Sequence, residues 1–356
     1  MNKRAVELEF NWIFIIIAGA VILSFFFVVA QKQKTVSQAR LALEISTQLE
    51  SAFVSAIQST QTQQSMPLPS EGITLSCGKT QLCDCKYSAF GKQTDFGDKI
   101  IFGPNKLNDY SAQLWAPDWQ APFRATNFLL ITTTKIKYVI VYSESDAPIR
   151  DTKTQIVRDL PAALKIQLVK EDELPSIKYD EDQTRIVFLI EPDINSIELL
   201  SKGKGVSAVY IDKIRNKAIF YNKKENSNNF ERIEKELLTD TSSSKSINDA
   251  MIYAAIFAQD PHLFECQTKE AYKKLNYVAQ IVSKRAETLS QLMQEQNRPQ
   301  CATLYPVQPA QTLEKIQNAA QKAAQNIAEA QSILPLARQL QTQNTDLVTT
   351  SCPPLY

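Results

Sequence analysis

The sequence predicts a mixed fold, α+β with an α/β part, attached to an N-terminal transmembrane helix. Three observations predict it: one long uncharged apolar run near the N-terminus, short central segments rich in Ile, Val and Tyr, and C-terminal apolar residues at helical spacing. They divide the chain into a short tail (1–9), a transmembrane helix (10–31), a stalk helix (32–66), a loop-rich, disulfide-linked β segment (67–126), an α/β domain (127–245) and a helical hairpin with a cysteine-bearing tail (246–356).

The overall composition is typical of a folded protein. Hydrophobic residues make up 44% of the chain and charged residues 22%, with a formal net charge of +1. This balance argues against a nucleic-acid-binding protein with a basic face. The part that follows the apolar run is long enough for one large domain or two smaller ones.

The apolar run at 10–31 has the length of a membrane span. As a helix, residues 13–30 cover roughly 27 Å, close to the ~30 Å hydrocarbon core of a bilayer. The run ends in Phe, Val and Ala followed by Gln31 rather than in a small-residue cleavage site, so we expect it to be retained as a signal anchor. Trp12 marks one membrane interface, and Lys32 and Lys34 mark the other. No second run of this length follows, which predicts a single-pass protein.

The orientation is predicted from the cysteines. Positively charged residues flank the run on both sides, so they do not decide it. Three of the six cysteines lie within 77–85 and one lies four residues from the end. This pattern is more typical of disulfides in an oxidising space than of thiols. We expect the bulk of the chain to be extracellular; the alternative is a cytoplasmic domain with six reduced cysteines.

The residues that lead into the apolar run are Lys3, Arg4, Ala5, Val6, Glu7, Leu8, Glu9 and Phe10. With this beginning, residues 3–30 resemble the start of archaeal type IV pilin-like, membrane-anchored surface proteins. In that family a basic residue, a small residue at a cleavage point and a glutamate precede a long apolar helix, and here Lys3, Ala5 and Glu9 precede one. Arg4 stands where the family has glycine if Glu9 takes the place of the glutamate. The resemblance implies a pilin-related, surface-directed anchor, and an ordinary signal anchor is the alternative.

The region after the apolar run predicts a second, amphipathic length of helix. Apolar residues recur there at steps of three and four over 35–64. No Gly or Pro separates the two regions, so we expect one continuous helix of roughly 80 Å over 10–64. Pro67 and Pro69 are expected to end it. The recurring positions are Ala42, Ile45, Leu49, Ala52 and Ala56.

The segment 67–126 predicts short strands and turns. Strands are expected at 73–76 and 99–102, with a hairpin between the cysteines of 77–85. The stretch LWAPDWQAPF concentrates Trp115, Trp119 and Phe123. Such a cluster can be an exposed interaction surface, although aromatic residues in loops more often close the edge of a core.

The next region alternates strands and helices. Near-continuous apolar strands indicate a sheet that is covered on both faces, hence a Rossmann-like or mixed three-layer α/β domain. Helices are expected at 152–160 and 194–200, and a solvated connection with a short helix at 230–238 follows. The predicted strands are 128–133, 137–143, 164–169, 185–190, 206–211 and 218–221.

The last hundred residues predict an antiparallel helical hairpin with coiled-coil spacing. The first arm, 269–296, carries Ala271, Leu275, Val278, Val282, Leu289 and Leu292. The second, 312–345, should be kinked by Pro335. Its apolar positions are Leu313, Ile316, Ala320, Ala323, Ile327, Ala330, Leu334 and Ala337.

The hairpin also suggests how the cysteines pair. Cys266 and Cys352 fall at the same end of it, so we expect them to pair. Cys77 is expected to pair with Cys83 or Cys85, which leaves the other to reach Cys301 in the hairpin turn. A zinc site is the alternative, but Cys-x5-Cys-x-Cys lacks the spaced Cys-x2-Cys pairs of familiar zinc modules.

No catalytic, cofactor-binding or metal-binding motif rises above background. His262 lies four residues before Cys266, a spacing that can place a base beside a thiol, but a disulfide at Cys266 would remove the nucleophile. Acidic residues at 171–173 and 180–182 have the pattern of solvated turns. Residues 202–205, Lys-Gly-Lys-Gly, lack the spacing of a phosphate-binding loop.

These features predict a structural or protein-interaction role at the cell envelope, without an enzymatic activity or cofactor. The expected partners are the lipid bilayer and a protein partner or second copy that packs on the heptad helices, with no nucleic acid. One alternative is a membrane-tethered envelope enzyme or ligand-binding protein with a site at the strand ends of the α/β domain. The other is a pilin-like subunit of a surface or secretion assembly.

Overall fold

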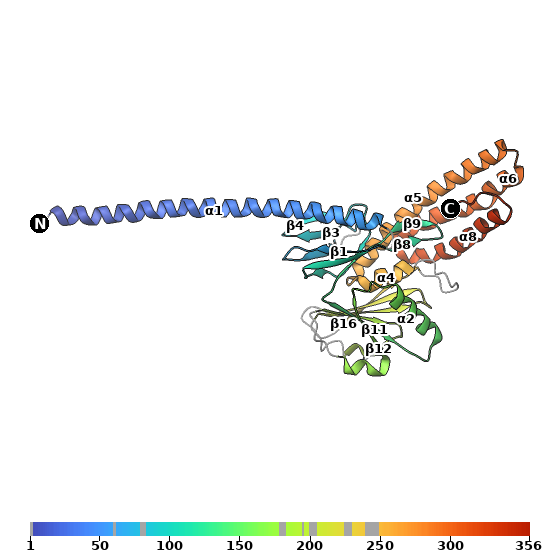
Figure 1. Ribbon diagram of the computed structural model, residues 1–356, viewed down its shortest axis with the longest axis horizontal. Coiled ribbons are helices and arrows are strands. Elements are labelled where there is room, and N and C mark those ends of the chain that lie inside the picture. The colour runs from blue at the N-terminus through green and yellow to red at the C-terminus, as the bar shows by residue number, and fades with distance from the viewer. Residues whose placement is uncertain are drawn as a thin grey trace.

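The computed structural model describes residues 3–59, 62–78, 83–177, 183–193, 196–198, 205–223, 230–238 and 249–356. A long N-terminal helix runs into a body of mixed sheets and helices, and C-terminal helices project from that body (Figure 1). The acidic residues predicted as a turn at 180–182, the Lys-Gly-Lys at 202–204 and the predicted connections at 226–229 and 239–244 lie outside the described residues.

The N-terminal helix α1 is continuous over Lys3–Gln58, so the apolar run and the amphipathic region share one helix as predicted. It ends earlier than expected. Residues Gln63–Pro67 form strand β1, which pairs antiparallel with β7, Ser111–Trp115. Two causes take these residues out of the helix. They pair with β7, and Pro67 favours an extended backbone at the residue that precedes it.

The first part of the body contains two small sheets and a hairpin. One sheet has the order β1-β7-β10-β5 and the other has the order β4-β3-β2-β6, while β8 and β9 pair with each other. The strands are β2 Ile73–Cys77, β3 Cys85–Ala89, β4 Lys92–Asp95, β5 Ile101–Phe102, β6 Lys106–Leu107, β8 Asp118–Gln120, β9 Arg124–Asn127 and β10 Leu129–Thr133.

Strand β10 was expected in the α/β sheet and instead lies in the first sheet. It pairs antiparallel with β7 and parallel with β5. All five of its residues are buried, which fits a strand that is covered on both faces. The apolar pattern therefore predicted the strand and its burial but not its sheet.

The α/β sheet has the strand order β12-β11-β13-β14-β15-β16. The first four strands are parallel, and β15 and β16 are antiparallel additions. Helix α2, Ala147–Asp159, follows β11, and the short helix η1, Glu171–Ser176, follows β12. The strands are β11 Ile136–Tyr142, β12 Lys165–Lys170, β13 Gln183–Phe188, β14 Val206–Asp212, β15 Lys217–Lys223 and β16 Phe230–Glu236.

Both faces are buried in the central strands of this sheet, β11, β13, β14 and β15, whereas most residues of the edge strands β12 and β16 are partly or fully exposed. Tyr138 and Ile140 of β11 belong to one apolar cluster, whereas Val139 and Val141 belong to another. The helix predicted at 230–238 is wrong: β16 pairs with β15 along its whole length. Cross-strand pairing at this edge overrides the helical preference of its Glu and Lys residues.

The C-terminal region contains more helices than the two predicted. Helix α7 packs along α5 and α8 folds back along α7. The predicted second arm is interrupted at Asn326, which is extended and whose side chain accepts a hydrogen bond from the Ala328 N–H at 3.2 Å. Pro335 lies in the first turn of α8, where a missing N–H costs little, and so does not kink a continuing helix. The elements are α4 Asp249–Phe257, α5 Pro261–Glu295, α6 Pro299–Val307, α7 Pro309–Gln325, η2 Ile327–Ser332 and α8 Ile333–Thr349.

The predicted apolar positions of these helices are mostly correct. All eight positions of the second arm are buried, although they lie on three elements instead of one helix. In α5, Ala271, Leu275 and Val282 are buried, Val278 and Leu289 are partly buried, and Leu292 is 40% exposed. The heptad surfaces of the described helices therefore pack largely against one another.

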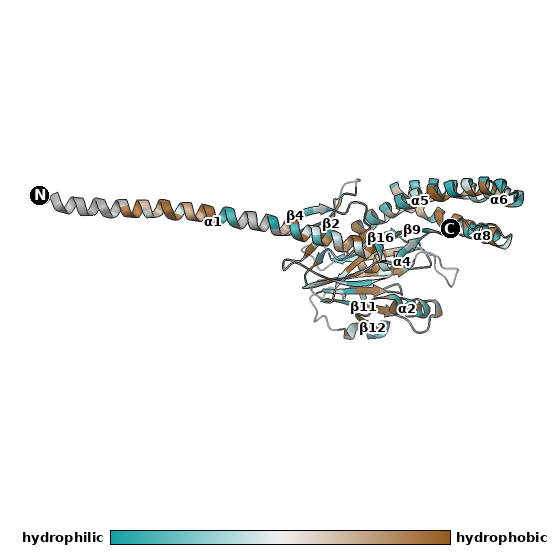
Figure 2. Ribbon diagram, turned by 45° about the horizontal axis from the view of Figure 1, so that its top comes forward, coloured by the Kyte–Doolittle hydropathy of each residue, from teal (hydrophilic) through white to brown (hydrophobic). Residues whose placement is uncertain are grey.

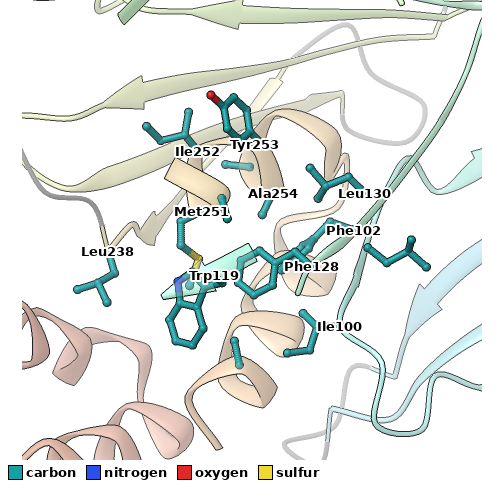
Figure 3. Packing of buried hydrophobic residues seen from close by; sticks show 14 of the residues in the cluster. Ile100, Phe102, Trp119, Phe128, Leu130, Leu238, Met251, Ile252, Tyr253 and Ala254 are labelled. Atoms are coloured by element: carbon teal, nitrogen blue, oxygen red, sulfur yellow. The ribbon is translucent and has the colours of Figure 1, made fainter. Parts of the chain in front are cut away.

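Helix α4 lies at the centre of the body. Residues 250–257 are all buried, which agrees with a segment that is apolar on every side. Figure 3 shows Met251, Tyr253 and Ala254 among Trp119, Phe128, Phe102 and Leu130. Through these contacts α4 joins the first sheet, the β8–β9 hairpin and the α/β sheet into one core.

Candidate functional site

The apolar end of α1 is long and apolar enough to cross a membrane, by length and composition. The qualifying stretch is Ile15–Gln33, and none of it is buried within the described protein. Figure 2 shows it well clear of the body. Trp12 and Lys32, the predicted interface residues, are exposed at its two ends; the side chain of Lys34 lies outside the described residues. Trp and Lys are residue types that favour the membrane–water interface.

The other end of α1 is seated in the body. A stripe of Ala42, Ser46, Leu49, Phe53 and Ala56 is buried, so Phe53 and Ser46 take the places that Ala52 and Ile45 were expected to fill. The first of these residues, Ala42, follows Gln33 by nine residues, or about 14 Å of helix. The helical connection between the apolar stretch and the body is therefore short.

Polar contacts fix the seated end as well. Phe53 packs edge-on against Tyr87 of β3, with 5.5 Å between ring centroids. The Tyr87 hydroxyl donates to Glu50 Oε2 at 3.3 Å, and the buried Lys99 forms an ion pair with the same carboxylate. Asn127 Nδ2 donates to the Ile57 carbonyl oxygen at 2.5 Å. The helix is thus held on its apolar and its polar side.

All six cysteines form disulfides, as Cys77–Cys85, Cys83–Cys266 and Cys301–Cys352. The first pair is one of the two predicted options. The predicted pairing of Cys266 with Cys352 is wrong, and so is the prediction that a cysteine of 77–85 reaches Cys301.

The chain reversal at Asn326 explains both corrections. Because α8 folds back along α7, it runs outward to the end where α6 lies and carries Cys352 to Cys301, with 5.6 Å between their Cα atoms. Cys266 stays at the inner end of α5 and meets Cys83, with 5.2 Å between Cα atoms. The second disulfide ties the β2–β3 region to the base of the helices.

Three of the sulfur atoms gather in one place. The Sγ atoms of Cys77, Cys85 and Cys266 lie within 4.8 Å of one another, and all three residues are buried. His262 Nε2 is 2.7 Å from the Gly78 carbonyl oxygen and 3.8 Å from Cys266 Sγ. As thiolates these groups would be a soft ligand set for an ion such as Zn²⁺. In the disulfide form, Cys266 offers no thiolate for His262 to activate.

The aromatic cluster that could have been an exposed interaction surface is buried. Trp115, Trp119 and Phe123 are 6%, 0% and 3% exposed, so the alternative of a core contribution is correct. Trp119 stacks on Phe128 with 5.5 Å between centroids, and Trp115 lies 4.8 Å from the ring of Tyr253. The two tryptophans pack near α4, and the ring of Phe123 lies against Tyr356 at the C-terminus, with 5.6 Å between centroids.

The acidic residues at 171–173 form the exposed first turn of η1.

One strand of the α/β sheet contains a buried charged residue. Arg185 of β13 is 3% exposed and was not among the predicted site residues. The signal that could have found it is a lone cation directly before the apolar run Ile-Val-Phe of a predicted buried strand, since arginine is almost never fully buried without partners.

No protein-family model matches this chain, and no curated protein and no solved structure is similar to it.

Proposed function

We propose that the chain is a single-pass, membrane-anchored cell-envelope protein. The observation that carries this proposal is α1 itself, one helix whose apolar end is unburied while its other end is built into the body. An exposed apolar stretch of this length requires lipid or another apolar surface to cover it. The short connection holds the body close to the bilayer.

The body lies on the exterior face in this proposal. The pairing of all six cysteines supports it, because disulfides persist in oxidising compartments and are rare in the cytosol. Non-reducing peptide mapping of the full chain from purified membranes tests it. We expect the three disulfide-linked peptide pairs, whereas six free thiols would contradict the exterior placement.

Membrane attachment has its own test. The full chain should stay in the membrane pellet after alkaline carbonate extraction and enter solution only with detergent. A variant in which Ile16, Val21 and Phe26, all more than half exposed, are changed to Asp should be released by carbonate. The matched control changes Thr47, which is exposed on the seated part of α1, to Asp and should stay in the pellet.

The role we propose is structural or interaction-based, without an enzymatic step. A protein partner or a second copy is part of the proposal. The heptad spacing suggested a large surface for such a partner. Most of that surface is covered in the structure, because the C-terminal helices pack against one another. On α5, Tyr277 and Ile281 are 62% and 67% exposed and lie four residues apart on one face. Cross-linking from this face in native membranes is the direct test.

A pilin-like subunit is the second candidate. Identical apolar helices that pack together could cover the exposed end of α1 in place of lipid, and the division of α1 into an unburied and a seated half favours this arrangement. Mass spectrometry of the native N-terminus tests it. A new N-terminus within residues 4–9 would support it, and an intact Met1 or Asn2 would contradict it.

We also propose that the α/β sheet has a Rossmann-like fold. Parallel strands in the order β12-β11-β13-β14, with both faces covered, support a Rossmann-like assignment for the α/β sheet. Sheets of this kind usually bind ligands at the carboxyl ends of their strands. In this protein, Tyr138, Arg185 and Ser207 line a recess at the opposite, amino ends of the strands.

A further inference from the structure

Arg185 is a buried cation whose hydrogen bonding is incomplete. Its Nε donates to the carbonyl oxygen of Ile256 at 3.1 Å, and its Nη2 donates to those of Ala255 and Ala258 at 3.0 and 2.6 Å. These contacts cap the end of α4. Nη1 is also buried and has no partner among the described residues.

Arg185 belongs to a row of side chains that crosses the sheet. The register places Tyr138 of β11 and Ser207 of β14 on either side of it. All three residues line a recess at the amino ends of these strands, together with Pro104, Phe257 and Gln259. The recess thus joins the α/β sheet, the first sheet region and the end of α4.

The charge at this recess is not balanced by a carboxylate. None of the described residues that line it is acidic. Burial raises the pKa of the Tyr138 hydroxyl to about 12, so this group is neutral at physiological pH. Burial lowers the pKa of Arg185 to about 9, which still leaves the guanidinium charged at pH 7.

The end of α4 offsets the charge only in part. A helix C-terminus carries roughly half a negative charge, which its carbonyl oxygens present to Nε and Nη2. A buried cation without a full counter-charge is costly, and so is a buried N–H without an acceptor. An anion beside Nη1 would relieve both costs.

The shape of the recess limits what can enter. It contains about 250 Å³ of empty space including its open mouth, where Gln183 and Gly205 are partly or fully exposed. The space within it that a small group can occupy is about that of one water molecule. This size favours a small planar anionic group such as a carboxylate over a bulky one.

We propose that this recess binds a carboxylate group, with Arg185 Nη1 as the charged donor and the Ser207 hydroxyl as a second donor. The carboxylate comes either from a small free acid or from a polypeptide, as a C-terminus or an acidic side chain of a partner. This site is independent of the proposed membrane anchoring, because no residue of α1 lines it.

The test uses the full chain in detergent micelles with acetate as the probe, at constant ionic strength. We expect acetate to raise the thermal unfolding midpoint in a saturable way, with binding confirmed by calorimetry. Two peptide probes identify the source: acetyl-Gly-Gly-Ala with a free carboxylate, and the same peptide as its amide. Peptide carboxylate that binds about tenfold tighter than acetate indicates a polypeptide source, and equal affinity indicates a free acid.

Two variants make the test specific. Ser207→Asp places a carboxylate beside Arg185 on the neighbouring strand, so it should raise the midpoint without acetate and reduce acetate affinity by more than about tenfold. Arg185→Lys keeps a positive charge but lacks Nη1, and it should also lose the acetate response. Ser145→Asp, at an exposed position in the loop before α2, is the matched control and should respond like the native chain.

Three results would overturn the proposal. The first is no saturable acetate effect on the native chain, which would leave a bound water as the occupant. The second is a response to chloride but not to acetate. The third is an undiminished acetate response in folded Ser207→Asp.

Discussion

Cys83 and Cys266 are bonded across 183 residues of sequence, and this bond joins the strands nearest the seated part of α1 to the base of α5. His262, one turn before Cys266, adds a hydrogen bond to the Gly78 carbonyl at the same junction. The β2–β3 region and the base of α5 are therefore joined covalently as well as by packing.

Removal of the Cys83–Cys266 disulfide should lower the stability of the body. On the chain-entropy model, closing a loop of this length stabilises the fold by about 5 kcal/mol. We expect Cys83→Ser/Cys266→Ser to lower the urea midpoint, monitored by the fluorescence of the buried tryptophans, and to speed hydrogen exchange in β2, β3 and the first turns of α5. Cys301→Ser/Cys352→Ser is the control, and it should speed exchange mainly in α6 and the end of α8. Equal exchange patterns in the two variants would contradict the assignment of the junction.

The seating of α1 can be tested at two adjacent residues. Phe53 is fully buried against Tyr87, whereas Val54 is 39% exposed. We expect Phe53→Ala to lower the free energy of unfolding by about 3–5 kcal/mol because it leaves a cavity in the core. Val54→Ala should change it by less than about 1 kcal/mol. Similar effects of the two changes would show that this end of α1 is not packed as described.

Glu265 should make stability depend on pH. Burial alone would raise its pKa, but hydrogen bonds and charges from Lys235 and Lys269 outweigh burial and lower it. A carboxyl group with a lowered folded pKa stabilises the fold above its unfolded pKa of about 4.3 and loses this contribution as the pH falls through the folded value. Glu265→Gln should therefore cost about 1 kcal/mol at pH 7 and much less near pH 3.

The control for this change is Glu270→Gln on the same helix. Glu270 pairs with Lys273 at the surface, where such pairs contribute little. We expect Glu270→Gln to change the free energy of unfolding at pH 7 by less than about 0.5 kcal/mol. A Glu265→Gln effect that is the same at both pH values would assign the role of Glu265 to packing rather than to charge.

Much of the local structure could be predicted from the sequence. The uncharged run predicted the apolar helix, and the absence of Gly and Pro predicted its continuation. Every apolar position predicted between Leu313 and Ala337 from alternating steps of three and four is buried, because helical burial repeats with the same period, although Ala319 and Ile333 are buried as well.

The arrangement of these elements could not be predicted. No Gly or Pro marks the reversal at Asn326, whose interruption depends on a local side-chain cap and on the contact of Gln331 with Glu236 of β16. A hairpin without this reversal places Cys352 at the same end as Cys266, which is why the predicted pairing of these two cysteines is wrong. The recess at Arg185 is made by segments that meet only in the folded chain, so the sequence could have singled out Arg185 as a cation in a buried strand but not the residues that surround it.

The most direct test of the proposed membrane placement is cysteine labelling in intact cells with a membrane-impermeant maleimide. Ile214 is 90% exposed in the turn between β14 and β15, and all native cysteines are bonded. We expect Ile214→Cys to be labelled in intact cells and Asn2→Cys, which precedes α1, to be labelled only after permeabilisation. Labelling of Asn2→Cys but not of Ile214→Cys in intact cells would contradict an exterior body on a single-pass membrane helix.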